Sequence, residues 1–148
     1  MRFLVQLAKS QKEEMSLAEI SQREGVSLPY VRKIFGILRS GGLVRASKGV
    51  QGGYSLLKPA SEITLREVFE VLGADLQEFS CSDFSGQFSI CANHGDCGVR
   101  PLLSLLKRKI DELLRGITLS QLIHEEHKVM NALQSKIETR SQQLLNTV

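Results

Sequence analysis

Three cysteines lie close together in the chain, Cys81, Cys91 and Cys97, and His94 lies between the last two. Cysteine thiolates hold iron–sulfur clusters and zinc ions, and a histidine nitrogen completes many such sites. The three cysteines are therefore candidate metal ligands, with His94 as a candidate fourth ligand. Their spacing does not separate an iron–sulfur cluster from zinc. Reactive thiols and cysteines without a role are the alternatives.

Basic residues form a second feature, because they concentrate in one half of the chain. Residues 1–58 contain ten lysines and arginines against four glutamates, whereas residues 59–148 contain nine against twelve acidic residues. A basic half joined to an acidic half indicates that the first half faces a polyanion such as DNA. The alternative is that short segments of any protein differ by this much.

Residues that contact DNA need a scaffold, and the first part of the chain predicts two short helices joined by a turn. A capping box that begins at Ser16 opens a helix over about 17–23, and Gly25 suits the left-handed turn that follows. Ser27 is the expected N-cap of a second helix over about 28–39. Two helices joined in this way predict a helix-turn-helix.

A short β-hairpin is expected directly after the second helix. Residues 43–45 and 54–57 have the pattern of two strands, and a glycine-rich basic loop lies between them. Strand, loop and strand after a helix-turn-helix make a winged helix. The predicted fold class is therefore mainly α with a small β-hairpin wing, although the loop alone also fits an ordinary hairpin turn.

Polar residues at the start of the second helix and in the wing are candidates for DNA contacts. The first turns of a recognition helix reach base edges in the major groove, where arginine binds guanine through two hydrogen bonds. We expect this contact from Arg32, and a phosphate or minor-groove contact from Lys48. The full candidate set is Ser27, Pro29, Tyr30, Arg32, Lys33, Arg39, Arg45, Ser47, Lys48 and Gly49. The alternative is that the helix charges form an ordinary solvated face.

The second half predicts three more helices and one long loop. A capping box at Thr64 opens a short helix, and residues 79–98, which hold all three cysteines, show no helical or strand period. A helix opened by Pro101 carries an apolar stripe wide enough to predict a partner helix from a second copy of the chain. Packing within its own domain is the alternative. Thr118 is expected to cap a last helix that continues through Ile137.

The chain as a whole is organised as a DNA-binding unit followed by sensor and dimer elements. Residues 1–10 have the apolar spacing of an additional helix. The predicted parts are a winged helix-turn-helix over 1–60, a linking helix and cysteine loop over 61–98, a dimerisation helix and following helix over 99–127, and a partly frayed helical tail over 128–148.

Several classes of protein do not fit the sequence. No apolar run approaches the roughly 18 residues of a membrane span, and no secretory signal is present, so we expect a cytoplasmic protein without membrane contact. No paired carboxylates, nucleophile–base pair or phosphate-binding loop appears, and the cysteines lack the Cys-x-x-Cys spacing of thiol oxidoreductases. We therefore do not expect an enzyme.

The motifs together resemble the Rrf2 family of bacterial winged-helix regulators. The matching segments are LAEISQREGVSLPYVRKIF (17–35), LRSGGLVRASKGVQGGYSL (38–56), ITLREVFEVL (63–72) and ITLSQLI (117–123). This resemblance implies a homodimer, with its dimer helix at about 99–115, that binds double-stranded DNA at a pseudo-palindromic operator. It also implies a repressor in which the three cysteines hold a 2Fe–2S or 4Fe–4S cluster that senses iron–sulfur, redox or nitric oxide status. A cluster-free regulator that uses thiols, zinc or a partner protein is the alternative.

The chain departs from this family at two places. In one group of iron–sulfur members a histidine three residues after the third cysteine completes the cluster, where this chain has Arg100. His94 would therefore substitute for it by chemistry and not by position. Other members take an oxygen or nitrogen donor from the N-terminal helix of the partner subunit. Family members also begin further upstream, whereas this chain begins within the first predicted helix. We therefore expect Met1 to be an internal methionine, with the natural start upstream.

Overall fold

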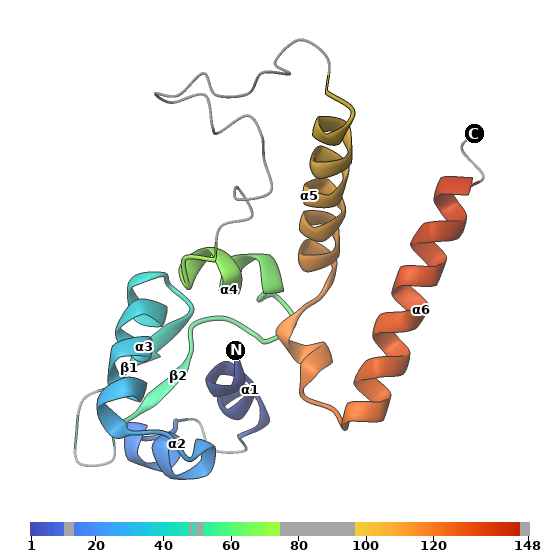
Figure 1. The fold of residues 1–148 in the computed structure, drawn as a ribbon. Coiled ribbons are helices and arrows are strands. Elements are labelled where there is room, and N and C mark those ends of the chain that lie inside the picture. Colours follow the sequence, from blue (N-terminus) through green and yellow to red (C-terminus); the bar gives the residue numbers. More distant parts are fainter. Residues whose placement is uncertain (11–13, 48, 50–51, 75–96, 146–148) are drawn as a thin grey trace, which may run out of the picture.

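A computed structural model describes residues 1–10, 14–47, 49, 52–74 and 97–145 of the chain. The elements in order are α1 (Arg2–Lys9), α2 (Leu17–Glu24), α3 (Leu28–Ser40), β1 (Val44–Ala46), β2 (Tyr54–Leu56), α4 (Leu65–Val71), α5 (Val99–Gly116), the 3₁₀ helix η3 (Leu119–Leu122) and α6 (Glu126–Leu145). The first three helices and the hairpin gather into one body, from which α5 and α6 extend (Figure 1). The predicted fold class, mainly α with a small β wing, is confirmed.

Local signals in the sequence place the helix-turn-helix where it was predicted. The Ser16 hydroxyl accepts a hydrogen bond from the Glu19 amide at the start of α2, and Gly25 ends that helix with a φ of 66°. Ser27 is the N-cap of α3, with proline in the first turn as expected. The helix ends at Gly41, and Gly42 follows with a φ of 72°. A residue with a side chain rarely adopts such a positive φ, so glycine is favoured at both turns.

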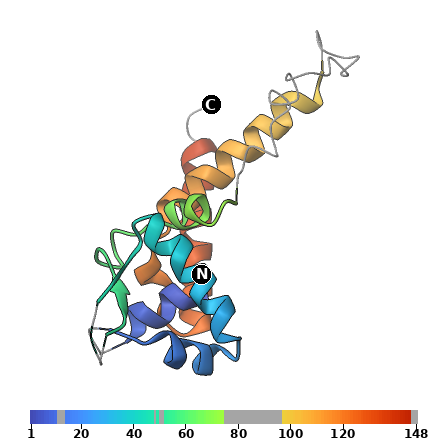
Figure 2. The same cartoon turned by 90° about the vertical axis from the view of Figure 1, so that its left-hand side faces the viewer.

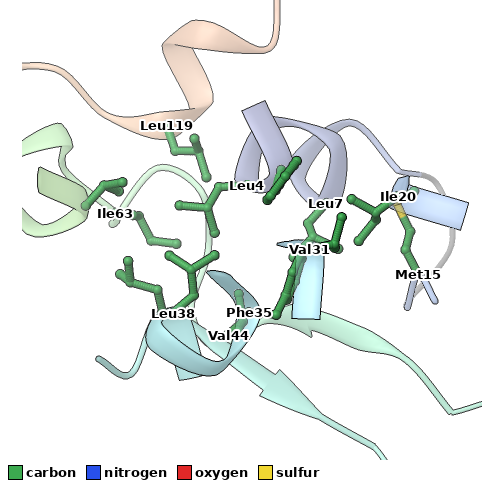
Figure 3. Close-up of a cluster of buried hydrophobic side chains, with 13 residues drawn as sticks. Leu4, Leu7, Met15, Ile20, Val31, Phe35, Leu38, Val44, Ile63 and Leu119 are labelled. Carbon is green, nitrogen blue, oxygen red and sulfur yellow. The ribbon is translucent and has the colours of Figure 1, made fainter. Parts of the chain in front are cut away.

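The core lies between the helices of the body and the hairpin. Figure 3 shows side chains from α1, α2, α3 and β1 meeting Ile63 and Leu119, which come from the far half of the chain. Ile20, Val31 and Phe35 are fully buried, at 0% exposure. Full burial of one such side chain stabilises the fold by about 1.5–3 kcal/mol. The core therefore orients α3 through its buried face.

The hairpin is antiparallel and has a short third neighbour. Arg45 lies opposite Ser55 in the register of β1 and β2. On the other edge of β2, the Tyr54 amide donates to the Met15 carbonyl at 2.8 Å, and the Met15 amide donates to the Tyr54 carbonyl at 3.0 Å. The segment before α2 therefore fixes the wing to the helix-turn-helix.

The second half confirms the predicted cap of α4 and corrects the predicted length of the helix that begins after Thr118. The capping box of α4 forms, because Thr64 accepts from the Glu67 amide and Glu67 accepts from the Thr64 amide. The expected helix from Thr118 through Ile137 is wrong, since Thr118 caps only η3 and a separate helix, α6, begins at Glu126. The physical reason is burial: Leu119 is fully buried and its amide donates to the Ile63 carbonyl at 2.8 Å.

Helix α5 begins at Val99, slightly earlier than the expected start at Pro101. It extends away from the body, and its N-terminal half lies far from the other elements (Figure 2). Among the helices that the structure describes, none combines the length and the apolar character that a bilayer crossing requires.

Candidate DNA-binding surface and dimer helix

One face of α3 packs into the core and the opposite face is open to solvent. Val31, Phe35 and Leu38 are buried. The predicted contact residues of α3 and its N-cap are all exposed: Ser27, Pro29, Tyr30, Arg32, Lys33 and Arg39. Most of them lie in the first two turns, the part of a recognition helix that reaches base edges. Arg39 lies about 10 Å further along the axis than Arg32, at 1.5 Å per residue, and so fits a backbone contact.

A chain of aromatic rings holds the start of α3 against the wing. The Tyr30 ring meets the edge of Phe3, with centroids 6.3 Å apart, and Phe3 stacks on Phe35 at 6.0 Å. Phe35 in turn contacts Tyr54 of β2 at 4.7 Å. Tyr30 nevertheless keeps 52% of its surface exposed, so it remains available to a ligand. Sequence reasoning missed Phe3 and Tyr54 as parts of this site.

The base of the wing is held by hydrogen bonds that involve two of the predicted contact residues. Arg45 Nε donates to the Ser55 hydroxyl at 3.0 Å, which leaves its other guanidinium nitrogens free for an anion. The Ser47 hydroxyl accepts from the Gly53 amide at 3.0 Å and donates to the Glu14 carboxylate. Ser47 therefore braces the wing from within. Gly49 is exposed, whereas Lys48 lies outside the described residues.

Glycine is required at one position of the wing base. A Cβ atom on Gly53 would lie 2.7 Å from the Met15 carbonyl oxygen, closer than real Cβ atoms approach backbone. Only a residue without a side chain allows the wing to approach the segment before α2 in this way. The start of β2 and the start of α3 lie at the same end of the molecule in both views (Figures 1 and 2). Both elements can therefore meet one surface of a duplex.

Acidic side chains of the same region are neutralised by other partners. The Glu24 side chain is only 6% exposed and lies 2.9 Å from Arg2 Nε and 2.6 Å from Gln6 Nε2. Glu19 pairs with Arg23 at 2.9 Å. The three basic side chains of α3, by contrast, have no carboxylate partner within the part of the chain that the structure describes: Arg32, Lys33 and Arg39. The exposed face of α3 is therefore positive and attracts phosphates.

Cys97 lies immediately before α5. The backbone amides of Arg100 and Val99 donate to its thiol, and these hydrogen bonds lower the pKa of Cys97 below its ordinary value. The thiolate that they favour is the form that binds metals, so this residue fits the predicted ligand role. The other candidate ligands lie outside the described residues: Cys81, Cys91 and His94. Within the described ranges, no three histidine, cysteine or acidic side chains converge on a metal-binding geometry.

The apolar stripe of α5 is mostly uncovered. No residue of this helix is buried, and Leu102, Leu105 and Leu106 are 54%, 42% and 44% exposed. At its C-terminal end the helix is fastened to α4, where Arg66 Nε lies 2.6 Å from Asp111 Oδ1 in an ion pair without hydrogen-bond geometry. A helix is thus present in the segment that was predicted to dimerise, and its apolar face is not covered by the described residues beyond that contact.

A family model confirms what the geometry suggests. The model for Rrf2, described as an iron-dependent transcriptional regulator, matches residues 1–125. The chain belongs to the Rrf2 family. As an Rrf2 protein it is a DNA-binding transcriptional regulator and not an enzyme, and the predicted family resemblance is confirmed.

Curated relatives of this Rrf2 protein carry the name IscR. The chain is 33% identical over 131 residues to the HTH-type transcriptional regulator IscR of Serratia proteamaculans, covering 88% of this chain and 77% of that one. It is 33% identical over 117 residues to IscR of Pectobacterium carotovorum, covering 79% and 69%.

Solved structures agree with the assignment. The structure of CymR, the global cysteine regulator of B. subtilis, matches with a TM-score of 0.66 and 25% identity, covering 81% of this chain and 86% of that one. T. potens IscR matches with a TM-score of 0.62 and 28% identity, covering 82% and 77%. The likeness thus extends over most of both chains.

Proposed function

We propose that this Rrf2 regulator is a homodimeric repressor whose DNA affinity depends on an iron–sulfur cluster held by Cys81, Cys91 and Cys97. One observation carries the proposal. Cys97 lies two residues before the first residue of α5, and α5 presents an apolar face that the described residues of the chain leave largely uncovered. A candidate metal ligand therefore lies next in sequence to the helix that carries the candidate dimer surface, so a change in ligation at Cys97 can alter the position of this helix.

The DNA-binding step is supported by the exposed positive face of α3. We expect Arg32 to bind a guanine edge, with Lys33 beside it and Tyr30 held in place by the Phe3 ring. Arg39 and Arg45 lie further out and fit phosphate contacts. Because the Ser47 hydroxyl is used within the chain, the wing contacts fall to Lys48 and Gly49.

The dimer is supported by the exposed leucines of α5. A second copy that covers them would bury apolar surface and place two recognition helices about a two-fold axis. Such a dimer binds two half-sites whose separation matches the distance between the helices. The operator is therefore expected to be a pseudo-palindrome.

The metal-binding step is supported by the hydrogen-bonded thiol of Cys97. When bound, an iron–sulfur cluster supplies iron that reacts with oxidants and nitric oxide. The backbone amides of Val99 and Arg100 lower the pKa of the Cys97 thiol and so favour the thiolate that ligates iron, and His94 is the candidate for a fourth ligand. A coupling of about 1–3 kcal/mol between the metal site and the DNA site suffices for a 5–150-fold change in affinity.

Anaerobic purification tests this proposal directly. We expect a coloured protein that contains iron and sulfide, and a Cys97→Ser variant that loses both while its far-ultraviolet circular dichroism is unchanged. The affinity for DNA from the region upstream of the protein's own gene is then measured with and without the cluster. A colourless protein with one zinc per chain would refute the iron–sulfur assignment.

A thiol-based regulator is a second candidate, and one observation favours it. The pKa of Cys97 is lowered by backbone hydrogen bonds, which raises the share of reactive thiolate. The similar structure of CymR from Staphylococcus aureus is described as an oxidized form. A metal-free wild-type protein whose DNA affinity changes after mild oxidation, while that of Cys97→Ser does not, would favour this candidate.

A further inference from the structure

The recognition helix and helix α4 meet at one unusually close contact. Gly41 ends α3, and a Cβ atom on it would lie 2.4 Å from Val71 Cγ1 and 2.5 Å from Val71 Cγ2. Val71 is the last residue of α4. Gly41 has a φ of −82°, which any residue adopts, so the backbone itself does not require glycine here. Glycine is required at position 41 because Val71 packs so closely against it.

The other end of α4 is fastened to α5. The Leu65 amide donates to the Ile117 carbonyl at 2.9 Å, and the Leu119 amide donates to the Ile63 carbonyl at 2.8 Å. The ion pair between Arg66 and Asp111 adds a side-chain link to these backbone bonds. Figures 1 and 2 both show α4 between the end of α3 and the base of α5.

We propose that Gly41 and Val71 are positioning residues that set the separation of the two recognition helices in the dimer, and with it the half-site spacing that the regulator accepts. This inference rests on the proposed dimer. There α5 lies at the two-fold axis, α4 is fixed to α5, and the end of α3 is fixed to α4. The contact of Gly41 with Val71 therefore helps to set the angle between α3 and the dimer axis, together with the core in which Leu119 meets the body.

The size of the contact makes the effect measurable. Ordinary van der Waals contact begins at 3.4 Å, so a methyl group at Gly41 must move away from Val71 by about 1 Å or more. The displacement occurs in both protomers and is enlarged along α3, which is about 20 Å long at 1.5 Å per residue. The resulting change in helix separation is of the order of one base-pair step, about 3.4 Å.

The test compares variants on duplexes that differ only in spacing. A half-site is first selected from a random double-stranded library with the wild-type protein, and is then placed in pairs whose separation varies by single base pairs. We expect Gly41→Ala to change the preferred spacing, or to lose about tenfold in affinity at the original spacing and less at a neighbouring one. The double variant Gly41→Ala/Val71→Ala should shift the profile most of the way back to that of the wild type, because it removes both Cγ atoms and leaves only the Val71 Cβ atom, at 2.9 Å.

Gly36→Ala is the matched control. Gly36 lies in the same helix, and nothing lies within 4 Å of an added Cβ atom there. If this residue touches DNA, its variant weakens binding equally at all spacings. Should Gly41→Ala fail to fold, Val71→Ala alone is expected to fold and to broaden the range of accepted spacings.

The outcomes separate this inference from the proposed function. A wild-type protein that binds half-sites with no preferred spacing would overturn the dimeric function and the inference with it. A wild-type preference that Gly41→Ala and Val71→Ala both leave unchanged would overturn the inference alone, as would a double variant whose profile stays the same as that of Gly41→Ala.

Discussion

The winged-helix body and helix α5 place the same type of residue in opposite surroundings. Leu4 and Leu38 of the body are 0% and 1% exposed, whereas Leu102 and Leu106 of α5 are 54% and 44% exposed. The body completes a core within one chain, and α5 does not. Stability of the fold and assembly of the proposed dimer are therefore expected to depend on separate parts of the molecule, and substitutions should alter them separately.

The largest effect is expected from the core of the body. Phe35→Ala removes a fully buried ring that also contacts Phe3 and Tyr54, so we expect it to lower the free energy of unfolding by about 3–5 kcal/mol. Urea denaturation followed by circular dichroism measures the change. Ile37→Ala, at a half-exposed position of the same helix, is the control and should cost about 1 kcal/mol or less. A loss of similar size in both variants would contradict the role of the α3 inner face.

A substitution on the exposed face of α5 should weaken the proposed dimer and leave the stability of the body unchanged. Leu106→Asp places a charge where a second copy is expected to pack, and we expect the dimer to weaken about 100-fold, or ~3 kcal/mol, while the melting of the body persists. Sedimentation equilibrium measures the dissociation constant. Ser104→Asp adds the same charge at another exposed position of α5 and should have little effect. Unfolding of the body by Leu106→Asp would show that this leucine belongs to the core instead.

The DNA-binding face of the body can be divided further. Arg32→Ala should lose about 10–100-fold in affinity, or 1–3 kcal/mol, for the selected DNA and much less for random DNA, because a base contact is lost. Lys48→Ala should lower the affinity for selected and for random DNA alike. It should also reduce the salt dependence of binding by the release of about one counterion. Fluorescence anisotropy at several salt concentrations separates the two. Equal losses on both DNAs for Arg32→Ala would refute base recognition, and Arg23→Ala, an ion-paired arginine of α2, serves as control.

Features encoded over a few residues could be predicted from the sequence. Ser16, Gly25 and Thr64 act through neighbours within one turn, and the structure places all three caps where their spacing indicates. The exposed position of Arg32 likewise follows from helical periodicity, because the buried residues of α3 recur every three to four positions.

Features that depend on distant contacts could not be predicted. The close approach of Gly41 to Val71 and the contact between Tyr30 and Phe3 join elements that are far apart in the sequence. The break after η3 has the same origin, because Leu119 is held by Ile63 and not by its own helix. Local pattern carries no information on which distant residue a side chain will meet.

The smallest effect on stability is expected at the contact between Lys58, which follows the wing, and Glu67 of α4. Lys58 Nζ donates to Glu67 Oε1 at 2.6 Å, and the Thr64 amide donates to Glu67 Oε2 at 2.9 Å. These bonds, that of Lys58 first, hold the pKa of Glu67 below its ordinary value of 4.5. The folded state therefore favours the carboxylate more than the unfolded state does. Its stabilising contribution is complete above about pH 4.5 and is lost as the pH falls through the lowered pKa of the folded state.

Replacement of the carboxylate should therefore matter at neutral pH and not in acid. Glu67→Gln should cost less than about 1 kcal/mol at pH 7, because the pair is more than one-third exposed and solvent screens it. Urea denaturation of both proteins between pH 7 and pH 3 should show the difference shrinking toward pH 3. In a Lys58→Met background the effect of Glu67→Gln should depend much less on pH, because the hydrogen bond from Lys58 that lowers the pKa of Glu67 most is absent. A difference that grows as the pH falls would mean that the folded state favours the protonated carboxyl of Glu67, and that the folded protein raises this pKa and does not lower it.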